Sequence, residues 1–296
     1  MTTQPLTGRD ATASRPARRW LAHAGTLPFF AYTGVFLILP TLLVVVGAFR
    51  SREGAFTLNG LEQLLSPRTL TIFANSLVLS AVTAVVGAVL GALIAYALAT
   101  APSGSMGRRL FTAFCSVVAQ FGGVMLAFAF IATFGINGLL TRLLQDWAGY
   151  TVNGQFLSTL PGVAVVYAYF QIPLMVIVFL PALDGLRVQW REATENLGGS
   201  TWTYWSRVAG PILAPSFLGS LLLLFANSFS AFATAAALIS QQTLIVPMEI
   251  ESALRNENDL GMDAYAQALA LGMIVVVALV MWAYAALQKR AARWTA

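Results

Sequence analysis

Six long apolar blocks recur along the sequence, and none of them contains Asp, Glu, Lys, Arg or His. An α-helix needs about 20 apolar residues to cross the ~30 Å hydrocarbon core of a bilayer, and each block is long enough. The blocks therefore predict an all-α polytopic membrane protein with six transmembrane helices. They are Leu27–Phe49, Ile72–Ala99, Phe111–Phe134, Leu160–Leu183, Ile212–Ile239 and Ala264–Leu287.

The polar residues between the blocks are too few to build a second folded unit. The chain is 58% hydrophobic and 10% charged, so its surface cannot be covered as that of a soluble globule is. We therefore expect one six-span domain over residues 27–288. A tail rich in Pro, Ser, Thr and Arg, residues 1–26, is predicted to be disordered, and residues 289–296 form a second short tail.

The positions of the basic residues predict the orientation in the membrane. An even number of spans puts both termini on one side, and twelve of the 17 Lys and Arg residues lie on that side against five on the other. Cytoplasmic connections carry the excess of Lys and Arg. Both termini are therefore predicted to be cytoplasmic, and the short basic clusters are orientation signals rather than a nucleic-acid surface.

Several chemistries are disfavoured by what the sequence lacks. A proton- or sodium-coupled carrier would be expected to hold an ionisable residue inside a span, and the blocks have none. One Cys and one His cannot form a metal cluster, so no metal site is expected. We find no phosphate-loop, GxSxG or HExxH motif, which argues against hydrolysis by this chain and predicts no catalytic residue.

Uncharged polar residues do occur within the blocks. Hydrogen bonds between helices explain most such residues, and the remainder are candidates for lining a translocation path. Gly87 and Gly91 form a GxxxG pair, which indicates close packing between two helices. The candidates for the translocation path are Asn75, Gln120, Gln171, Asn227 and Ser230.

The connection between the fourth and fifth blocks, Asp184–Pro211, is too long for a simple turn. Its periodicity predicts a helix over 188–197 with one apolar face, broken by Gly198 and the glycine that follows it. A second short helix is expected over 202–208, ended by Gly210-Pro211. Such a pair of helices suits either a protein partner or the membrane surface, where Trp, Tyr and Arg are also enriched.

This connection resembles the cytoplasmic signature of permeases from binding-protein-dependent ATP-driven importers, which reads E-A-A, three residues, G, nine residues, I-x-L-P. Here Glu192-Ala193-Thr194 is followed after three residues by Gly198, and after nine more by Val208-Ala209-Gly210-Pro211. The spacing fits throughout. Thr194, Val208 and Gly210 depart from the pattern, and Gly210 is expected to remove an apolar contact and loosen the second half.

The resemblance extends to the six-span layout and implies a role for residues 188–211, which we call the coupling segment. In such importers this segment inserts into a groove on the ATPase, so that ATPase closure tilts the spans. Glu192 is then implied to contact the ATPase and Gly198 to permit the bend, while burial arguments add the apolar anchors. The complete predicted coupling set is Trp190, Glu192, Ala193, Leu197, Gly198, Trp202 and Pro211.

The resemblance also implies the partners. They are two ATPase subunits that carry ATP and Mg, a second permease, and an external substrate-binding protein, assembled in a bacterial inner membrane. The second permease is expected to be a different chain, and a second copy of this chain is the alternative. This chain itself is expected to bind no cofactor.

Details such as FQIPLMV, residues 170–176, look most like the polyamine, phosphonate and ferric-ion group. They point to a polyamine such as spermidine or putrescine, with 2-aminoethylphosphonate or ferric ion as alternatives. The acidic outer loop over 249–263 would suit a cation or be a solvated loop. A stand-alone carrier and a membrane-embedded enzyme are the rival classes.

Overall fold

The computed structural model describes residues 26–50, 55–102, 104–149, 154–239, 245–255 and 262–292. Within these ranges the chain is helical apart from turns and one isolated bridge between Arg50 and Phe56, which confirms the all-α prediction. The expected disordered tail lies outside the described residues except for Thr26. Of the expected C-terminal tail, residues 289–292 continue the last helix and 293–296 lie outside the description.

Six helical segments of the described chain are long and apolar enough to cross a membrane, as predicted. They are Leu27–Gly47, Pro67–Thr100, Gly123–Trp147, Leu160–Asp184, Thr201–Phe229 and Met262–Ala286. The elements in chain order are α2 (Leu27–Thr33), η1 (Gly34–Ile38), α3 (Leu39–Gly47), α4 (Asn59–Leu64), α5 (Pro67–Thr100), α6 (Met106–Gln120), α7 (Gly123–Phe134), α8 (Leu139–Ala148), η2 (Gly154–Ser158), α9 (Leu160–Asp184), α10 (Val188–Asn196), α11 (Thr201–Tyr204), η3 (Trp205–Ala209), α12 (Gly210–Phe229), α13 (Ala233–Leu238), α14 (Val246–Arg255) and α15 (Met262–Ala292).

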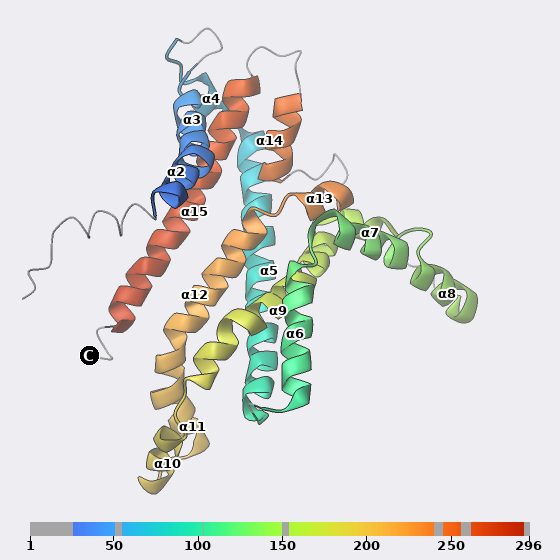
Figure 1. Ribbon diagram of the computed structural model, residues 1–296. Coiled ribbons are helices and arrows are strands. Elements are labelled where there is room, and N and C mark those ends of the chain that lie inside the picture. Colours follow the sequence, from blue (N-terminus) through green and yellow to red (C-terminus); the bar gives the residue numbers. More distant parts are fainter. Residues whose placement is uncertain are drawn as a thin grey trace, which may run out of the picture.

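Two of the predicted blocks are interrupted. The prediction of an unbroken helix over 111–134 is wrong, because α6 ends at Gln120 and α7 begins at Gly123, whose φ of +75° no helix interior adopts. The block 212–239 is likewise divided, since α12 ends at Phe229 and α13 begins at Ala233. Figure 1 shows α7 turning away from the axis of α6 to run beside α13.

The two interruptions are joined by a hydrogen bond between distant parts of the chain. The Gly123 N–H donates to Thr234 Oγ1 over 2.8 Å, and the Thr234 hydroxyl lies 3.2 Å from the Gly123 carbonyl, to which it donates. The Tyr167 hydroxyl of α9 donates to the Ala231 carbonyl between α12 and α13 over 2.7 Å. Backbone groups released by the breaks are thus paired inside the protein, as a non-polar solvent requires.

The centre of the bundle is the contact of α5 with α9, and α12 crosses both (Figure 1). The GxxxG pair lies in this contact, as predicted from its spacing. A Cβ added at Gly87 would lie 2.8 Å from Gln171 Cβ, and one at Gly91 would lie 2.5 Å from Met175 Cβ and 2.6 Å from the Ile172 carbonyl oxygen. Neither glycine can carry a side chain without moving α9 away.

A separate layer forms at the end of the bundle where α5 begins. There α14 packs between α5 and α15 around an apolar cluster that includes Ile72, Val246 and Leu269. The Val246 N–H donates to Ser76 Oγ of α5 over 2.8 Å, which fixes the start of α14. In contrast, the first span, α2 to α3, packs mainly against α15 and has none of its apolar window buried.

We expect Gly91→Ala to destabilise the fold, because the new methyl meets backbone and Cβ atoms of α9. Overpacking of this kind costs about 1–3 kcal/mol, which should lower the thermal unfolding midpoint of the detergent-purified protein by several degrees. Gly107→Ala is the matched control, since nothing lies within 4 Å of a Cβ there. A midpoint for Gly91→Ala equal to that of the control would contradict the close contact.

Candidate functional site

The predicted first helix of the coupling segment is present as α10, and its end is built around Gly198. The Gly198 N–H donates to the Glu195 carbonyl over 3.0 Å and the Gly199 N–H to the Thr194 carbonyl over 2.9 Å. This pairing is a Schellman motif, which needs a left-handed residue at its centre. Gly198 supplies that residue with φ +77°, so the bend assigned to it from the sequence is observed.

Gly199 has no room for a side chain, although the family signature specifies only the glycine at position 198. A Cβ at Gly199 would lie 2.7 Å from Thr194 Cγ2 and 2.9 Å from the Thr194 carbonyl oxygen, whereas a Cβ at Gly198 would meet open space. Thr194 itself donates its hydroxyl to the Trp190 carbonyl over 2.8 Å. The threonine at this position therefore faces the turn, and its methyl group requires the second glycine.

The second half of the coupling segment differs from the prediction. Ser200 caps α11 by accepting from the Thr203 N–H, as expected, but the helix does not end at Gly210-Pro211. Instead α11, η3 and α12 run on as one helical segment. The prediction of a stop there is wrong because η3 is a π-helical turn, in which the Gly210 N–H donates to the Trp205 carbonyl.

The π-helical turn accommodates both residues that should have stopped the helix. Pro211 has no N–H, and its ring would clash with the carbonyl four residues earlier in a regular α-helix, so a widened turn relieves it. A Cβ at Gly210 would lie 2.5 Å from the Trp205 carbonyl oxygen. Gly210 therefore allows the continuous helix, and the expectation that it loosens this half is wrong.

The coupling segment exposes apolar side chains at the tip of the bundle opposite α14 (Figure 1). Leu197 is 89% exposed and Trp202 is 79% exposed. Glu192 and Ala193 are also exposed, while Trp190 is half-buried beneath the Arg187 guanidinium, whose carbon lies 5.9 Å from the ring centroid. A protein partner or the bilayer surface would cover these apolar groups.

The second half of the coupling segment packs against the bundle. Tyr204 is buried, and the Trp205 ring packs edge-on against Tyr96 of α5 with their centroids 5.3 Å apart. A separate ion pair between Arg108 and Asp184 joins α6 to the end of α9, just before the coupling segment begins. Movement of the tip would therefore be transmitted directly to α5 and α12.

The five candidates for the translocation path lie in different environments. Gln120, Asn227 and Ser230 are exposed, and all three stand at the interruptions, at the end of α6 and around the end of α12. Asn75 is half-buried on α5. Gln171 is fully buried, and its Nε2 donates to the Leu224 carbonyl of α12 over 2.8 Å, so it does not reach the surface of this chain.

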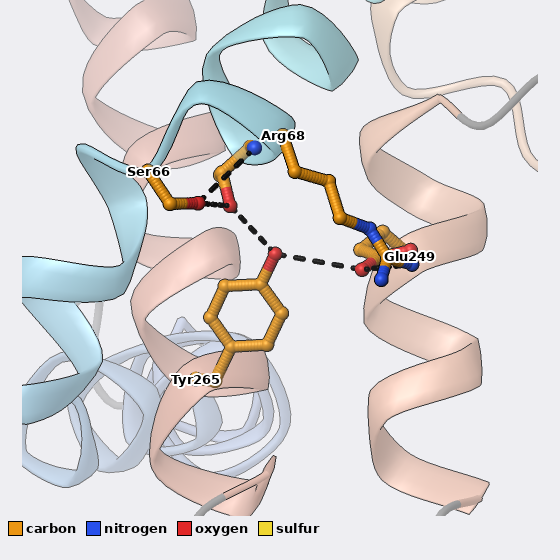
Figure 2. Close-up of polar contacts among 5 residues, drawn as sticks. Ser66, Arg68, Glu249 and Tyr265 are labelled. Atoms are coloured by element: carbon orange, nitrogen blue, oxygen red, sulfur yellow. Dashed lines mark hydrogen bonds and ion pairs between the residues drawn. The ribbon is translucent and has the colours of Figure 1, made fainter.

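A polar network at the far end of the bundle holds a carboxylate that the sequence placed in a loop. Glu249 is 4% exposed within α14, and its Oε1 lies 3.3 Å from Arg68 Nη2. Figure 2 shows Tyr265 of α15 reaching the same carboxylate, with the Tyr265 hydroxyl 3.5 Å from Oε1. The interpretation of Glu249 as part of a solvated acidic loop, or as an attractant for a cation, is therefore wrong for this residue.

Among the described residues no group of three or more His, Cys, Asp or Glu side chains could hold a metal ion. The structure therefore offers no geometry for a metal centre in those ranges. At the helix interruptions the described residues bring together hydroxyls, amides and backbone atoms, which can bind or guide a solute.

The family model and the similar proteins found by comparison agree with one another. The family described as "Binding-protein-dependent transport system inner membrane component" matches residues 87–293, more than two thirds of the chain. The spermidine/putrescine transport system permease protein PotB of Haemophilus influenzae is 23% identical over 86% of this chain and 90% of its own. The sulfate transport system permease protein CysW of Synechocystis is 24% identical over 84% and 87%.

A solved structure shares the fold. A chain of a bacterial ABC transporter involved in the import of the acidic polysaccharide alginate superposes with a TM-score of 0.71 and 19% identity, covering 95% of this chain and 98% of that one.

We expect the two glycines of the bend to respond differently to substitution. Gly198→Asn should be tolerated because Asn adopts the left-handed conformation, whereas Gly198→Val should cost about 1–2 kcal/mol of strain. Gly199→Val should open the bend through its clash with Thr194. The measurement is the rate of tryptic cleavage after Arg191 in the folded protein. Equal rates for Gly198→Asn and Gly198→Val would contradict the left-handed assignment.

Proposed function

The chain belongs to the family of binding-protein-dependent transport system inner membrane components, the permeases of ABC importers, and on this premise we propose that its coupling segment docks onto a separate ATPase. The observation that carries the proposal is the tip formed by α10 and α11. It holds the bend at Gly198 and exposes most of the surface of Leu197 and Trp202. A well-packed apolar anchor beside polar groups is the usual composition of a binding hot spot.

Docking at this tip has a direct route into the membrane. The helical segment from Thr201 to Phe229 contains α11, the second half of the tip, and the fifth span. A push on α11 is therefore a push on α12, and the Trp205 contact with Tyr96 carries it to α5. The apolar span cores lack ionisable groups, which supports an external source of energy rather than a proton or sodium gradient.

The orientation and partners form part of the same proposal. The C-terminal end of α15 lies toward the same end of the bundle as α10 and α11 (Figure 1), in agreement with cytoplasmic termini and the excess of Lys and Arg there. The proposed assembly contains a second, different permease, two ATPase subunits that bind ATP and Mg, and an external substrate-binding protein. This chain acts in it as a transport subunit without catalytic groups.

For the substrate we propose a polyamine such as spermidine or putrescine. The similarity to PotB over most of both chains supports this choice. The similarity to a sulfate permease is comparable, so the substrate is tested separately from the transport role. The polar residues at the interruptions, Gln120, Asn227 and Ser230, are uncharged and suit transient contacts with a small polar solute. Asn75 is proposed to join them.

Leu197→Asp and Trp202→Ala should each weaken ATPase binding. Loss of a hot-spot contact costs about 2 kcal/mol, or roughly a 30-fold loss of affinity, measured by co-purification and titration of the ATPase with the membrane complex. The matched control is Met106→Asp, since Met106 is 68% exposed at the start of α6 but lies outside the coupling segment. Unchanged ATPase binding in both tip variants would refute docking at this site.

The substrate is tested on the external binding protein that works with this permease. Calorimetric titration with spermidine, putrescine, 2-aminoethylphosphonate, ferric ion and sulfate should show a polyamine binding with a Kd of about 1 μM or tighter. ATP-dependent uptake of the same compound into vesicles containing the full complex then completes the assignment. Tight binding of sulfate or the phosphonate with no response to polyamines would replace the polyamine proposal.

A further inference from the structure

Helix α8 (Leu139–Ala148) has two sides of opposite character, and both are exposed. Its apolar residues recur at positions i, i+1, i+4, i+5 and i+8, which places them on one side of a helix with 3.6 residues per turn. The other side carries the exposed residues Arg142, Gln145 and Asp146. The exposed residues of the apolar side are Leu139, Leu140, Leu143, Leu144 and Trp147.

The direction of α8 relative to α7 is fixed by the turn between them. The Thr141 hydroxyl donates to the Gly135 carbonyl over 2.9 Å, and Thr141 is buried. A Cβ at Gly138 would lie 2.5 Å from the Thr133 carbonyl oxygen, so the turn closes tightly on the end of α7. Helix α7 packs against α13 and η2, while α8 extends away from the bundle (Figure 1). The position of α8 is therefore set through α7.

The charges on α8 make it unsuitable for the hydrocarbon core. Arg142 and Asp146 lie one turn apart on this helix, and charged side chains are costly at the centre of a bilayer. The crossing does not need α8, because α6 has 15 residues and α7 has 12. Together they provide about 40 Å of helix for a core of about 30 Å, which leaves room for the bend between them.

The apolar side of α8 continues a surface that lipid already covers. Helix α7 belongs to a membrane-spanning segment and exposes Met125 and Phe128, and Ile136 is exposed in the turn that leads to Leu139. Lipid that covers α7 therefore reaches α8 without a break. Because α9 ends beside the coupling segment, its start and the preceding η2 lie at the other end of the bundle, and α7 packs against η2 there. Trp147 then stands where Trp is enriched, at a membrane surface.

We propose that α8 is an interfacial helix bound to the bilayer surface opposite the coupling segment. Its leucines and Trp147 lie at the boundary of headgroups and acyl chains, while Arg142 and Asp146 face water. The third crossing is then made by α6 and α7. Such a helix fixes the depth of α7, and with it the hydrogen bond between Gly123 and Thr234 that joins the two interruptions. A protein partner is the rival occupant, and its dissociation would leave the whole apolar side in water.

The test attaches a nitroxide spin label to Leu143→Cys or to Gln145→Cys, which lie two residues apart on opposite sides of α8. The buried Cys115 is first replaced by Ala, so that each variant has one cysteine. The full chain is placed in vesicles of phosphatidylethanolamine and phosphatidylglycerol, both alone and in the assembled importer. Relaxation of the label by oxygen, which dissolves in hydrocarbon, is compared with relaxation by a water-soluble nickel chelate.

The label at position 143 should respond mainly to oxygen and report a depth of about 5–10 Å, and the label at position 145 should respond mainly to nickel. Leu139→Cys, one turn earlier, should repeat the result for position 143 and guards against a local effect of one label. Equal access of nickel to positions 143 and 145 would overturn the proposal. Access of neither reagent to position 143 would also overturn it, because protein would then cover the apolar side. The measurement needs no ATP hydrolysis, so failure of ATPase docking leaves its result unchanged.

Discussion

The close approach of α5 to α9 is the contact on which the rest of the bundle depends. Gly87 and Gly91 bring the two backbones together where any side chain would collide with α9. In a bilayer no hydrophobic force drives helices together, so close packing and a few hydrogen bonds must do so. The absence of a Cβ at Gly87 also makes room for Gln171, and through it the contact reaches α12. One pair of small residues thus positions three of the central helices.

The interruptions follow from the need to pair every backbone group inside the membrane. A helix that ends there leaves N–H and C=O groups without partners in the helix. Here the Thr234 hydroxyl accepts from the Gly123 N–H, and the Tyr167 hydroxyl donates to the Ala231 carbonyl. The π-helical turns serve the opposite purpose. Each of η1 and η3 ends two residues before a proline, Pro40 and Pro211, and the wider turn lets the helix continue. Pro40 and Pro211 therefore lie within continuous helical segments, whereas Gly122-Gly123 and Gly198-Gly199 lie at breaks between helices.

The sequence was sufficient for the features that depend on local composition. The length and apolar character of the blocks predict six spans, and the spacing around Glu192 and Gly198 predicts α10 and its bend. Interruption of the predicted blocks 111–134 and 212–239 was missed because an apolar run looks the same whether or not a residue such as Gly123 adopts a positive φ. The stop expected at Gly210-Pro211 failed for a similar reason, since only the structure shows the π-helical turn. The partners of buried Glu249 are Arg68 and Tyr265, which come from two other helices and are not evident from the residues around Glu249.

The parts of the chain nearest the coupling segment and those furthest from it are held in different ways. At the tip, α11 to α12 is a single helical segment braced by Trp205 against Tyr96, so it can transmit force with little loss. At the other end, α14 is fastened to α5 and α15 by Ser76, Arg68 and Tyr265 and belongs to a separate apolar cluster (Figure 2). Between them, α12 shares the apolar core around Leu213 and Leu224 with α5 and α9, and single hydroxyl and amide groups add hydrogen bonds to that contact. Because an apolar core of this kind repacks with difficulty, the middle of α12 is held to α5 and α9 by packing as well as by hydrogen bonds, and the three central helices form one packed unit.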